Sequence, residues 1–467
     1  MMLTLSKKRI ALLTGAIVLA LAIWLGLPWE MPDAQRYFDP VGTRHLQTDE
    51  IGQLKSVSEE YLNLSLSGDD FKGWNTENQG FWKYVIAFSF YGLPSAMIID
   101  PAHAAEYKAT MDQMIGKMKS KKVWGDFTDH GFGTDPISVQ NIMYKGHLNL
   151  MFGLFQLSTG DLRYAREFAW LTKQLAEEMR LHHRGYYEGV TCEPNAWFVE
   201  CNTIGIMSLH IYDKLYGTHY ALNEIQWSLD FIKSRMQDKD SGLYYRVYMP
   251  NLDTVNKQLL GYTNAWVLTF LHPFLKDEIE NTYPVFKERL TYSIGPYAAI
   301  RRQTGSKPDK VAQIFGMWAA KELGDPVLFG KLRNAVDKFG RLSPEESSGG
   351  LGYEDADGRL INGVVLATKL HLGWNNVIDH DWGHRKLPYA EPNIAGMDWR
   401  DLLPDRIYAM NRGGALPDAI DKRPCPNCFW GDYRSVPMLS KGKKAEQSIC
   451  PPNTGSSCGL TSLAPLE

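Results

Sequence analysis

Helix stop signals recur along this chain at nearly regular intervals. Glycine just past a helix end, and proline shortly after it, are residues that commonly terminate helices. Six such stops are about 49 to 60 residues apart, at Asp100-Pro101, Gly160, Gly217, Pro273, Gly324 and Gly373. A mostly apolar stretch precedes each stop. An amphipathic stretch follows several of them, as at residues 162–179 and 223–236.

This alternation predicts a ring of apolar helices inside a ring of amphipathic ones. One helix pair cannot bury its faces alone, so neighbouring pairs must stack. We therefore expect an all-α fold, an (α/α)6 barrel over residues 75–385, with minor β-hairpins such as the Tyr-rich stretch 241–250. Residues 30–74 are expected to form a lead-in, and the Pro-, Gly- and Cys-rich residues 386–467 an irregular tail.

An apolar run near the N-terminus, residues 10–28, is long enough to cross a bilayer, which takes about 20 residues. The basic residues 7–9 precede it, and such charges keep their side of the run in the cytoplasm. Residues 1–29 are thus predicted to anchor the chain in the inner membrane, with the barrel in the periplasm. A cleaved signal peptide is the alternative. The one Ala-x-Ala sequence in this region, residues 20–22, lies inside the run.

Most cysteines of the chain lie in the tail, at Cys425, Cys428, Cys450 and Cys458. Cysteines outside the cytoplasm usually pair, so disulfides are favoured there. The CPNC sequence could supply half of a zinc site, but the second pair lacks that spacing. A redox-active pair is less favoured, because no thioredoxin-like βαβ pattern surrounds it.

Charge and aromatic content narrow the function. Fifty Lys and Arg residues are set against 53 Asp and Glu, giving a formal net charge of −3. This balance does not suit a nucleic-acid partner. Aromatic residues make up 12% of the chain, and so much aromatic surface needs a large core or an apolar cavity.

One inner helix is predicted to begin within the sequence GTDPISVQNIMYKGHLNL. Asp135 is a suitable N-cap, and Pro136 suits the first helical position. Met143 and His147 are four residues apart and share a face of this helix. A lone histidine on an apolar face is usually a core residue. His147 becomes a candidate for catalysis only because of residues in the neighbouring repeat.

The segment VTCEPNAWFVECN, residues 190–202, leads into the next inner helix. Loops at this position surround one mouth of the barrel, so Cys192, Glu193 and Cys201 are expected near His147. A poorly hydrated cavity pushes the pKa values of His and Glu toward neutrality. General acid–base catalysis requires such values, which makes these four residues candidates for catalysis.

The two cysteines of this segment suit either a disulfide or two thiols. Exported proteins favour the disulfide. Two helical turns between the cysteines would place them about 9 Å apart, at a rise of 1.5 Å per residue. A disulfide needs Cα atoms within about 7 Å. Because the loop can also fold back, both states stay open.

Several long runs of the sequence resemble the linalool dehydratase/isomerase family. They are KYVIAFSFYGLPSAMIIDP, KKVWGDF, GFGTDPISVQNIMYKGHLNLMFGLFQLSTG, CEPNAWFVECN, YDKLYGTHY and YTNAWVL. The similarity is strong over residues 78–275 and weaker over the rest of the barrel. Long runs in matching order are far more specific than a short motif.

The resemblance implies a fold, an assembly and a reaction. Members of the family are (α/α)6 barrels that form homo-oligomeric rings and need no metal or organic cofactor. They are carbon–oxygen lyases and isomerases: they dehydrate the tertiary allylic alcohol linalool to myrcene, and they isomerise linalool and geraniol. A small hydrophobic allylic alcohol is therefore the expected substrate.

The resemblance also implies roles for individual residues. The expected catalytic residues are His147, Cys192, Glu193, Cys201, Tyr84 and Tyr262. The expected substrate-binding residues are Met143, Phe198 and Trp266, together with Tyr353, which lies near the start of another inner helix. A tyrosine at such a start is, on its own, more often a packing residue.

These residue types suit the chemistry of dehydration. An acid must protonate the leaving hydroxyl, and a base must take a proton from a neighbouring carbon. Aromatic faces can stabilise an allylic cation between the two steps, or a cysteine can attack and form a thioether. The family also has an Asp and a Tyr, six residues apart, upstream of its first inner helix. The corresponding stretch here, residues 59–74, has no such pair in register.

Two other function classes suit the same features. An (α/α)6 epimerase or glycoside hydrolase would need a second carboxylate about 5–10 Å from Glu193, for which Glu354 and Asp135 are the candidates. A non-catalytic envelope protein that binds a lipid or a partner would be favoured by a disulfide between the two cysteines of 190–202, with His147 buried against apolar atoms only.

Overall fold

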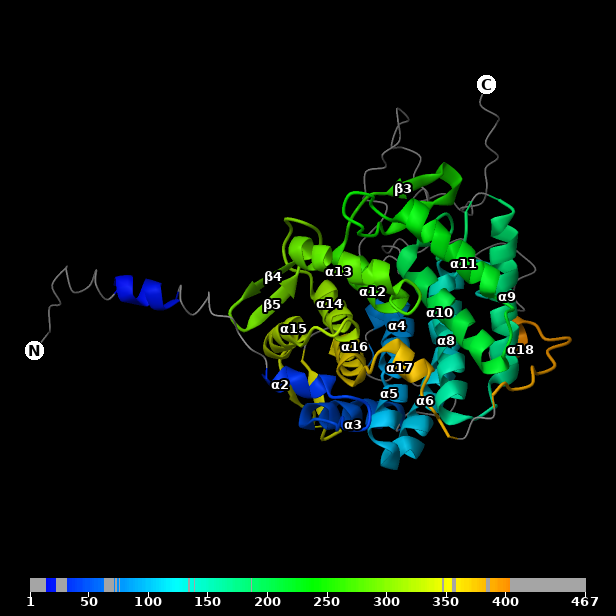
Figure 1. Ribbon diagram of the computed structural model, residues 1–467. Helices are drawn as coiled ribbons and strands as arrows, with labels where there is room; N and C mark the ends of the chain where they lie inside the picture. The colour runs from blue at the N-terminus through cyan, green and yellow to red at the C-terminus, as the bar shows by residue number, and fades with distance from the viewer. Residues whose placement is uncertain are drawn as a thin grey trace, which may run out of the picture.

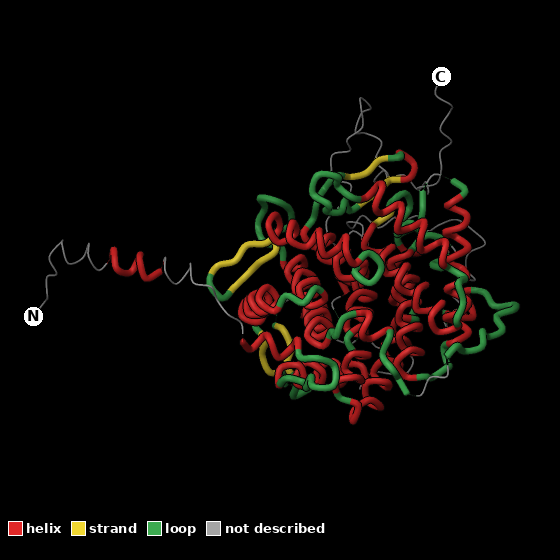
Figure 2. Tube along the Cα trace, viewed as in Figure 1, coloured by secondary structure: helices red, strands yellow, loops and turns green. Residues whose placement is uncertain are grey.

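The structure is a computed structural model, and helices dominate the part of the chain that it describes (Figures 1 and 2). The described residues are 14–21, 32–62, 71, 74, 76–132, 135–137, 139–185, 187–346, 348–354, 358–383 and 387–403. The tail cysteines, with the disulfides and the zinc site considered for them, lie outside these residues.

Six buried helices form a closed inner ring. They are α4 (Trp82–Tyr91), α8 (Ile142–Thr159), α10 (Val199–Tyr216), α12 (Gly261–Leu271), α14 (Lys310–Glu322) and α16 (Gly358–Leu370). Each packs on the next in this order, and α16 packs back on α4. The ring closes because these helices are apolar nearly all round, and only helices on both sides can bury such surfaces.

Six further helices surround this ring (Figure 1). They are α3 (Thr48–Leu62), α6 (Ala104–Met118), α9 (Ala165–His183), α11 (Leu222–Phe231), α13 (Lys276–Leu290) and α15 (Pro326–Phe339). Each buries one face and exposes the other, as an amphipathic sequence requires. The expected (α/α)6 barrel is confirmed.

Five of the inner helices end within three residues of a predicted stop, whereas α4 ends at Tyr91 and the stop at Asp100-Pro101 follows α5. Helix α8 ends at Gly160 and α10 at Gly217, with φ angles of 67° and 60°. Gly324 and Gly373 follow α14 and α16 with φ angles of 68° and 91°. Residues other than glycine rarely adopt these left-handed angles, which is why the stops are legible in the sequence.

The outer ring includes a helix from the segment expected to be a separate lead-in, residues 30–74. Helix α3 packs between α6 and α16. Its Gln53 Nε2 donates to Asn362 Oδ1 at 2.6 Å, and its Asp49 pairs with the buried Lys369 at 2.7 Å. The barrel therefore begins before residue 75.

Helix α8 begins at Ile142, later than the predicted N-cap at Asp135. Asp135 Oδ1 accepts a hydrogen bond from the Ile137 amide at 2.8 Å and so stabilises a turn. Gln140 and Asn141 have φ angles of 61° and 56°. Because two consecutive left-handed residues interrupt a helix, the expected start at Asp135 and Pro136 is wrong.

Short strands lie between the helices. Strands β1 (Trp197–Phe198), β2 (Val247–Met249) and β3 (Thr254–Asn256) form one antiparallel sheet. Two hairpins pair β4 (Thr291–Ile294) with β5 (Tyr297–Ile300), and β6 (Leu342–Pro344) with β7 (Leu351–Tyr353). Strand β2 falls within the expected hairpin region 241–250.

Minor helices complete the described chain. The α-helices are α2 (Pro32–Gln35), α5 (Leu93–Ile99), α7 (Lys121–Asp129), α17 (Trp374–Ile378) and α18 (Trp399–Leu402). The 3-10 turns are η1 (Arg36–Phe38), η2 (Thr76–Phe81), η3 (Pro101–His103) and η5 (Pro250–Leu252), and η4 (Ile232–Met236) is a π turn.

One apolar stretch of the described residues, Gln79–Ile99, is long enough to span a membrane, but 89% of its most apolar window is buried inside the barrel. It is therefore a core element. Of the apolar run 10–28, the structure describes residues 14–21, which are helical and exposed. The anchor stays a prediction.

Candidate active site

The first two turns of four inner helices bring together most of the predicted site residues. Tyr84 lies on α4, His147 on α8, Cys201 on α10 and Tyr262 on α12, and all four are buried. Because inner helices of such a barrel run in the same direction, their N-terminal turns meet at one mouth. The segment with Cys192 and Glu193 precedes β1 at this same mouth.

This segment folds back on itself before α10. The Cys192 amide donates to the Ala196 carbonyl at 2.8 Å, and the Ala196 amide donates to the Glu193 carbonyl at 3.0 Å. Asn195 allows the reversal with a left-handed φ of 59°. The chain between the two cysteines is thus a turn and a strand, and the separation expected for two helical turns does not apply.

The reversal brings the two cysteines close together. Cys192 and Cys201 are both buried and free, and Cys201 is near enough to affect the titration of Cys192. Burial, followed by the interaction with Cys201, raises the pKa of Cys192 well above its usual range. The pair therefore rests as thiols in this structure, and the disulfide is absent from it.

His147 stands in an aromatic cage. Its ring centroid lies 5.5 Å from that of Tyr84, 5.4 Å from Phe88, and 5.9 Å from both Tyr91 and Trp266. Its Nδ1 is 2.6 Å from the Tyr91 hydroxyl. Its Nε2 has no hydrogen-bond partner in the described chain.

Burial keeps this imidazole neutral. It lowers the pKa of His147 to about 3, with a smaller contribution from the positive charge of Lys83. A neutral imidazole with one nitrogen held by Tyr91 leaves the other nitrogen without a partner among the described residues. That is the geometry of a proton acceptor or donor awaiting a substrate.

Tyr84 links the imidazole to the thiols. Burial raises its pKa well above the usual range, and electrostatic interactions with the ionised forms of Cys201, Cys192, Glu193 and Glu200 would add to the increase in that order. These groups are close enough to Tyr84 to act on its hydroxyl. They form one cluster in a water-poor site.

A buried carboxyl that sequence reasoning missed lies beside this cluster. Glu200 Oε1 accepts a hydrogen bond from Thr263 Oγ1 and is 4.0 Å from Arg246 Nε. The Arg246 guanidinium lies 4.7 Å from the Phe198 ring and 5.7 Å from the Tyr262 ring. Burial raises the pKa of Glu200, although Arg246 acts against this. Its place next to Cys201 in the first turn of an inner helix is the signal that could have found it.

Two cage residues were also missed. Phe88 and Tyr91 follow Tyr84 at four and seven residues along α4, so all three share one face. That spacing is visible in the sequence. Of the predicted substrate-binding residues, Trp266 forms part of the cage, Phe198 packs under Arg246, and Met143 is buried one helical turn before His147.

The structure does not bring Tyr353 to the cluster. Its hydroxyl donates to Asp337 Oδ1 at 2.5 Å. Burial, followed by the charges of Asp337 and Asp49, raises the pKa of Tyr353 well above its usual range. The side chain is thus buried beside α15 and α3, away from the cage. The expected contact between Tyr353 and the substrate is thus not supported.

The two carboxylates considered as partners of Glu193 are elsewhere. Glu354 is about half exposed and pairs with Arg341 at 3.2 Å, and Asp135 caps a turn. Within the described ranges, no group of three or more His, Cys, Asp or Glu side chains could hold a metal ion. The expectation of a reaction without metal or cofactor stays a prediction.

A closed double ring of helices that buries a neutral histidine in an aromatic cage, with two free cysteines and two carboxyls near the same mouth, defines an (α/α)-barrel protein with a candidate site of enzyme type. The sequence pattern of the linalool dehydratase/isomerase family matches residues 83–359, more than half of the chain. The chain belongs to the linalool dehydratase/isomerase family.

Solved structures with similar chain traces are helical-barrel proteins. One is the GH76A α-1,6-mannanase from Salegentibacter sp. HEL1_6, with 11% identity, 69% of this chain and 98% of that chain covered, and a TM-score of 0.47. Another is a possible member of the GH105 family from Salmonella enterica, with 11% identity, coverages of 74% and 98%, and a TM-score of 0.49. At this identity and TM-score, neither bears on the chemistry of this site.

Proposed function

We propose that this protein is a cofactor-independent dehydratase and isomerase of a small, terpene-type allylic alcohol. The observation that carries the proposal is the unpartnered Nε2 of a neutral His147, inside an aromatic cage and beside two thiols. Membership of the linalool dehydratase/isomerase family supports the reaction class.

The thiol pair suits the acid step. A thiol proton of Cys201 goes to the substrate hydroxyl, the carbon–oxygen bond breaks, and water leaves with the bonding electrons. The thiolate that remains can accept a hydrogen bond from the nearby Cys192. Because burial favours the neutral form of Cys192, this thiol keeps its proton as a hydrogen-bond donor, and attack by a resting Cys192 thiolate is disfavoured.

The cage suits the rest of the reaction. The faces of Phe88 and Trp266 stabilise the allylic cation. His147 Nε2 then takes a proton from the neighbouring carbon, and the diene forms. This requires the tautomer in which Nδ1–H donates to the Tyr91 oxygen. The proton returns from His147 to the thiolate of Cys201, with Tyr84 between them. If water adds to the other end of the cation instead, it gives one proton to the Cys201 thiolate, and the product is the isomeric alcohol.

The two alternatives have less support. A sugar enzyme needs a second carboxylate facing Glu193, and neither Glu354 nor Asp135 offers it. An aromatic, apolar cage also suits an isoprenoid better than a polyhydroxylated sugar. A disulfide between the two cysteines, and a His147 with apolar neighbours only, would favour a non-catalytic binding protein. Instead, the cysteines are free and His147 contacts the Tyr91 hydroxyl.

The test is turnover by the purified full chain, kept reduced, with linalool and no added metal. Gas chromatography should detect the diene. Cys201→Ala should lower the rate at least about a hundredfold, since general acid–base help is worth about 10²–10⁴-fold. It should still fold, because one deleted atom leaves a small cavity. Ser208→Ala removes one oxygen from the same helix away from the cage, and should keep its rate.

Three results would contradict this proposal. A full rate in Cys201→Ala would remove that thiol from the mechanism. Turnover of a glycoside or amino sugar, with none of any allylic alcohol, would favour the carbohydrate enzyme. Tight binding of linalool with no turnover would favour the non-catalytic protein.

We also propose that residues 10–28 anchor the protein in the inner membrane, with the barrel in the periplasm, and that the barrels form a homo-oligomeric ring. The apolar run with basic residues before it supports the anchor. A reporter that is active only in the cytoplasm, fused after Glu467, should stay silent. Light scattering should give a mass of several chains.

A further inference from the structure

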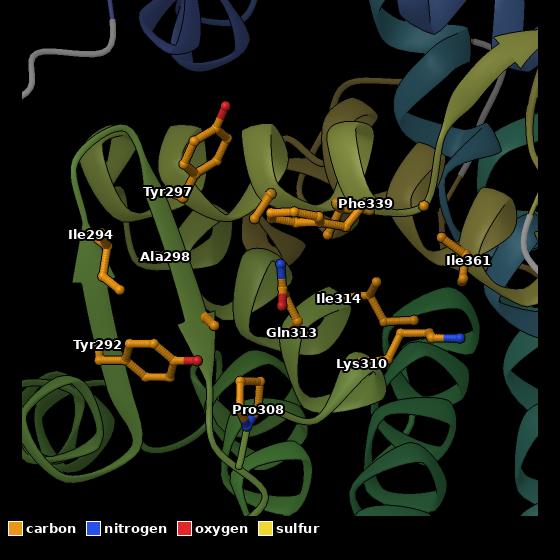
Figure 3. Close-up of a pocket in the computed structure, with 14 residues that line it drawn as sticks. Tyr292, Ile294, Tyr297, Ala298, Pro308, Lys310, Gln313, Ile314, Phe339 and Ile361 are labelled. Atoms are coloured by element: carbon orange, nitrogen blue, oxygen red, sulfur yellow. The ribbon is translucent and has the colours of Figure 1, made fainter.

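A cavity lies at the edge of the barrel, between the β4–β5 hairpin and helices α14, α15 and α16 (Figure 3). Its volume is about 540 Å³, within the range of about 300–1,000 Å³ that is typical of small-molecule sites. Its walls are mainly apolar and aromatic: Ile294, Tyr297, Ile314, Val336, Phe339 and Ile361.

Helix α14 separates this cavity from the aromatic cage. Ile314 lines the cavity. The next residue, Phe315, points to the barrel interior, where its ring lies 4.9 Å from Trp266 and 5.1 Å from Phe88. The cavity instead reaches the outer surface, since Ile294 and Phe339 at its edge are 54% and 72% exposed. It is therefore a distinct site.

Besides Lys310 and the hydroxyls of Tyr292 and Tyr297, the lining contains one amide side chain, that of Gln313. Figure 3 shows the Gln313 amide standing in the middle of the lining residues. Among the described residues, it has no hydrogen-bond partner for its side chain. An amide both donates and accepts hydrogen bonds, and so matches a hydroxyl group. Lys310, the one charged residue of the lining, is already engaged in another interaction.

The position of the cavity suits a ligand that dissolves in lipid. Helix α2, which follows the apolar run 10–28, packs on α15. Tyr37 lies just beyond α2. Its ring centroid is 5.3 Å from that of Phe329 and 5.1 Å from the guanidinium carbon of Arg333, and both of these residues are on α15. In a chain anchored through 10–28, residues 29–31 alone separate the anchor from α2, which would keep this face within reach of the bilayer, where apolar alcohols concentrate.

We propose that this cavity binds a small, uncharged hydrocarbon with one hydroxyl group, and that the Gln313 amide is the hydrogen-bond partner of that hydroxyl. The site is separate from the aromatic cage and requires no turnover. It goes beyond the proposed reaction, so either can fail without the other.

The experiment uses the full chain in lipid nanodiscs and a photoreactive diazirine derivative of 1-decanol. After irradiation, mass spectrometry should find the label on peptides that contain residues 292–299 or 335–340. Unlabelled 1-decanol should compete for this labelling better than decane does, because only the alcohol can hydrogen-bond Gln313.

Two variants with a control make the test specific. Gln313→Leu should weaken competition by 1-decanol about two- to tenfold, the usual worth of one hydrogen bond, and leave competition by decane unchanged. Ala335→Phe should fill the cavity and abolish the labelling. Val327→Phe adds a ring to an exposed position of the same helix and should keep the labelling.

Labelling confined to the cage residues would overturn the proposal. So would labelling of 292–299 or 335–340 that persists in folded Ala335→Phe, with equal competition by the alcohol and the alkane. If circular dichroism shows that Ala335→Phe is unfolded, Gln313→Leu still provides the test: an unchanged preference for 1-decanol over decane in that variant would overturn the proposal.

Discussion

The contact between Tyr91 and His147 defines the state of the candidate base. Burial alone makes the imidazole neutral, because the pKa of His147 falls to about 3. It does not determine which ring nitrogen holds the proton. The Tyr91 hydroxyl, 2.6 Å from Nδ1, is the group that can select the tautomer with a free lone pair on Nε2.

Tyr91→Phe should therefore lower the rate of dehydration at least about tenfold. This loss is smaller than the full contribution of general acid–base catalysis, about 10²–10⁴-fold, because His147 itself remains. The ¹⁵N NMR signals of His147 should shift toward a mixture of tautomers. Tyr144→Phe is the matched control: Tyr144 is equally buried on α8, and its hydroxyl donates to the Met118 carbonyl at 2.9 Å. Equal losses of rate in both variants would show that Tyr91 acts only through stability.

The neutral state of His147 also predicts its response to pH. A lowered pKa means that the basic form persists at all pH values above about 3. The ¹⁵N shifts of His147 should hence stay constant from pH 5 to pH 8. A titration with a midpoint near 6.5, the ordinary value for histidine, would contradict the water-poor cage.

At the scale of elements, a carboxylate joins three inner helices at the opposite end of the barrel. Glu322, at the end of α14, accepts hydrogen bonds from His272, which follows α12, at 2.7 Å, and from His371, which follows α16. Burial alone would lower the pKa of His272, but the hydrogen bond and charge of Glu322 outweigh it and raise this pKa. Burial would raise the pKa of Glu322, but the two histidines lower it.

This arrangement gives stability a defined pH dependence. Because the folded pKa of His272 is raised, its contribution is complete below about pH 6.5 and is lost as pH rises through the folded pKa. The contribution of Glu322 is present above the ordinary carboxyl pKa and is lost as pH falls through its lowered value. Urea unfolding of the parent chain should show stability falling on the alkaline side of pH 6.5.

Glu322→Gln should lower the free energy of unfolding by about 3 kcal/mol near pH 6, as is typical when one partner of a buried ion pair is removed. It should also flatten the fall of stability between pH 6 and pH 9. Glu288→Gln, an exposed position on α13, is the control and should match the parent chain. A parallel fall in both variants would show that Glu322 does not hold His272 protonated.

At the scale of the whole molecule, the barrel is closed by a helix from outside the repeat region that the sequence predicts. Helix α3 buries Leu54, Val57 and Tyr61 and completes the outer ring, where it packs on the outer helix α6 and the inner helix α16. Burial of one large apolar side chain contributes about 1.5–3 kcal/mol. Three of them approach the total stability of a protein, about 5–15 kcal/mol.

Removal of residues 1–62 should therefore abolish cooperative unfolding in thermal melts followed by circular dichroism. Removal of residues 1–31 alone should leave a sharp melting transition, since α3 and the chain from residue 32 are retained. A sharp transition in the longer truncation would mean that the inner ring closes without α3.

The architecture was readable from sequence because its signals are local. A glycine such as Gly160 or Gly217 ends a helix through its own backbone angle, and the apolar stretches between such stops can be buried only as an inner ring. The same local reasoning, together with a family resemblance, identified Tyr84, His147 and Cys201 in the first turns of inner helices.

The tertiary structure alone decided which side chains meet. The approach of Cys192 to Cys201 depends on a chain reversal at Asn195. Two helical turns between them would have kept the two cysteines apart. The carboxyl of Glu200 acquires its role from Thr263 and Arg246, which are distant in sequence. Tyr353, which also precedes an inner helix, faces Asp337 instead, because strand β7 pairs with β6 and turns it away from the cage. Helix stops are properties of single residues, whereas the partners of a buried polar group are chosen by packing between helices far apart in the chain.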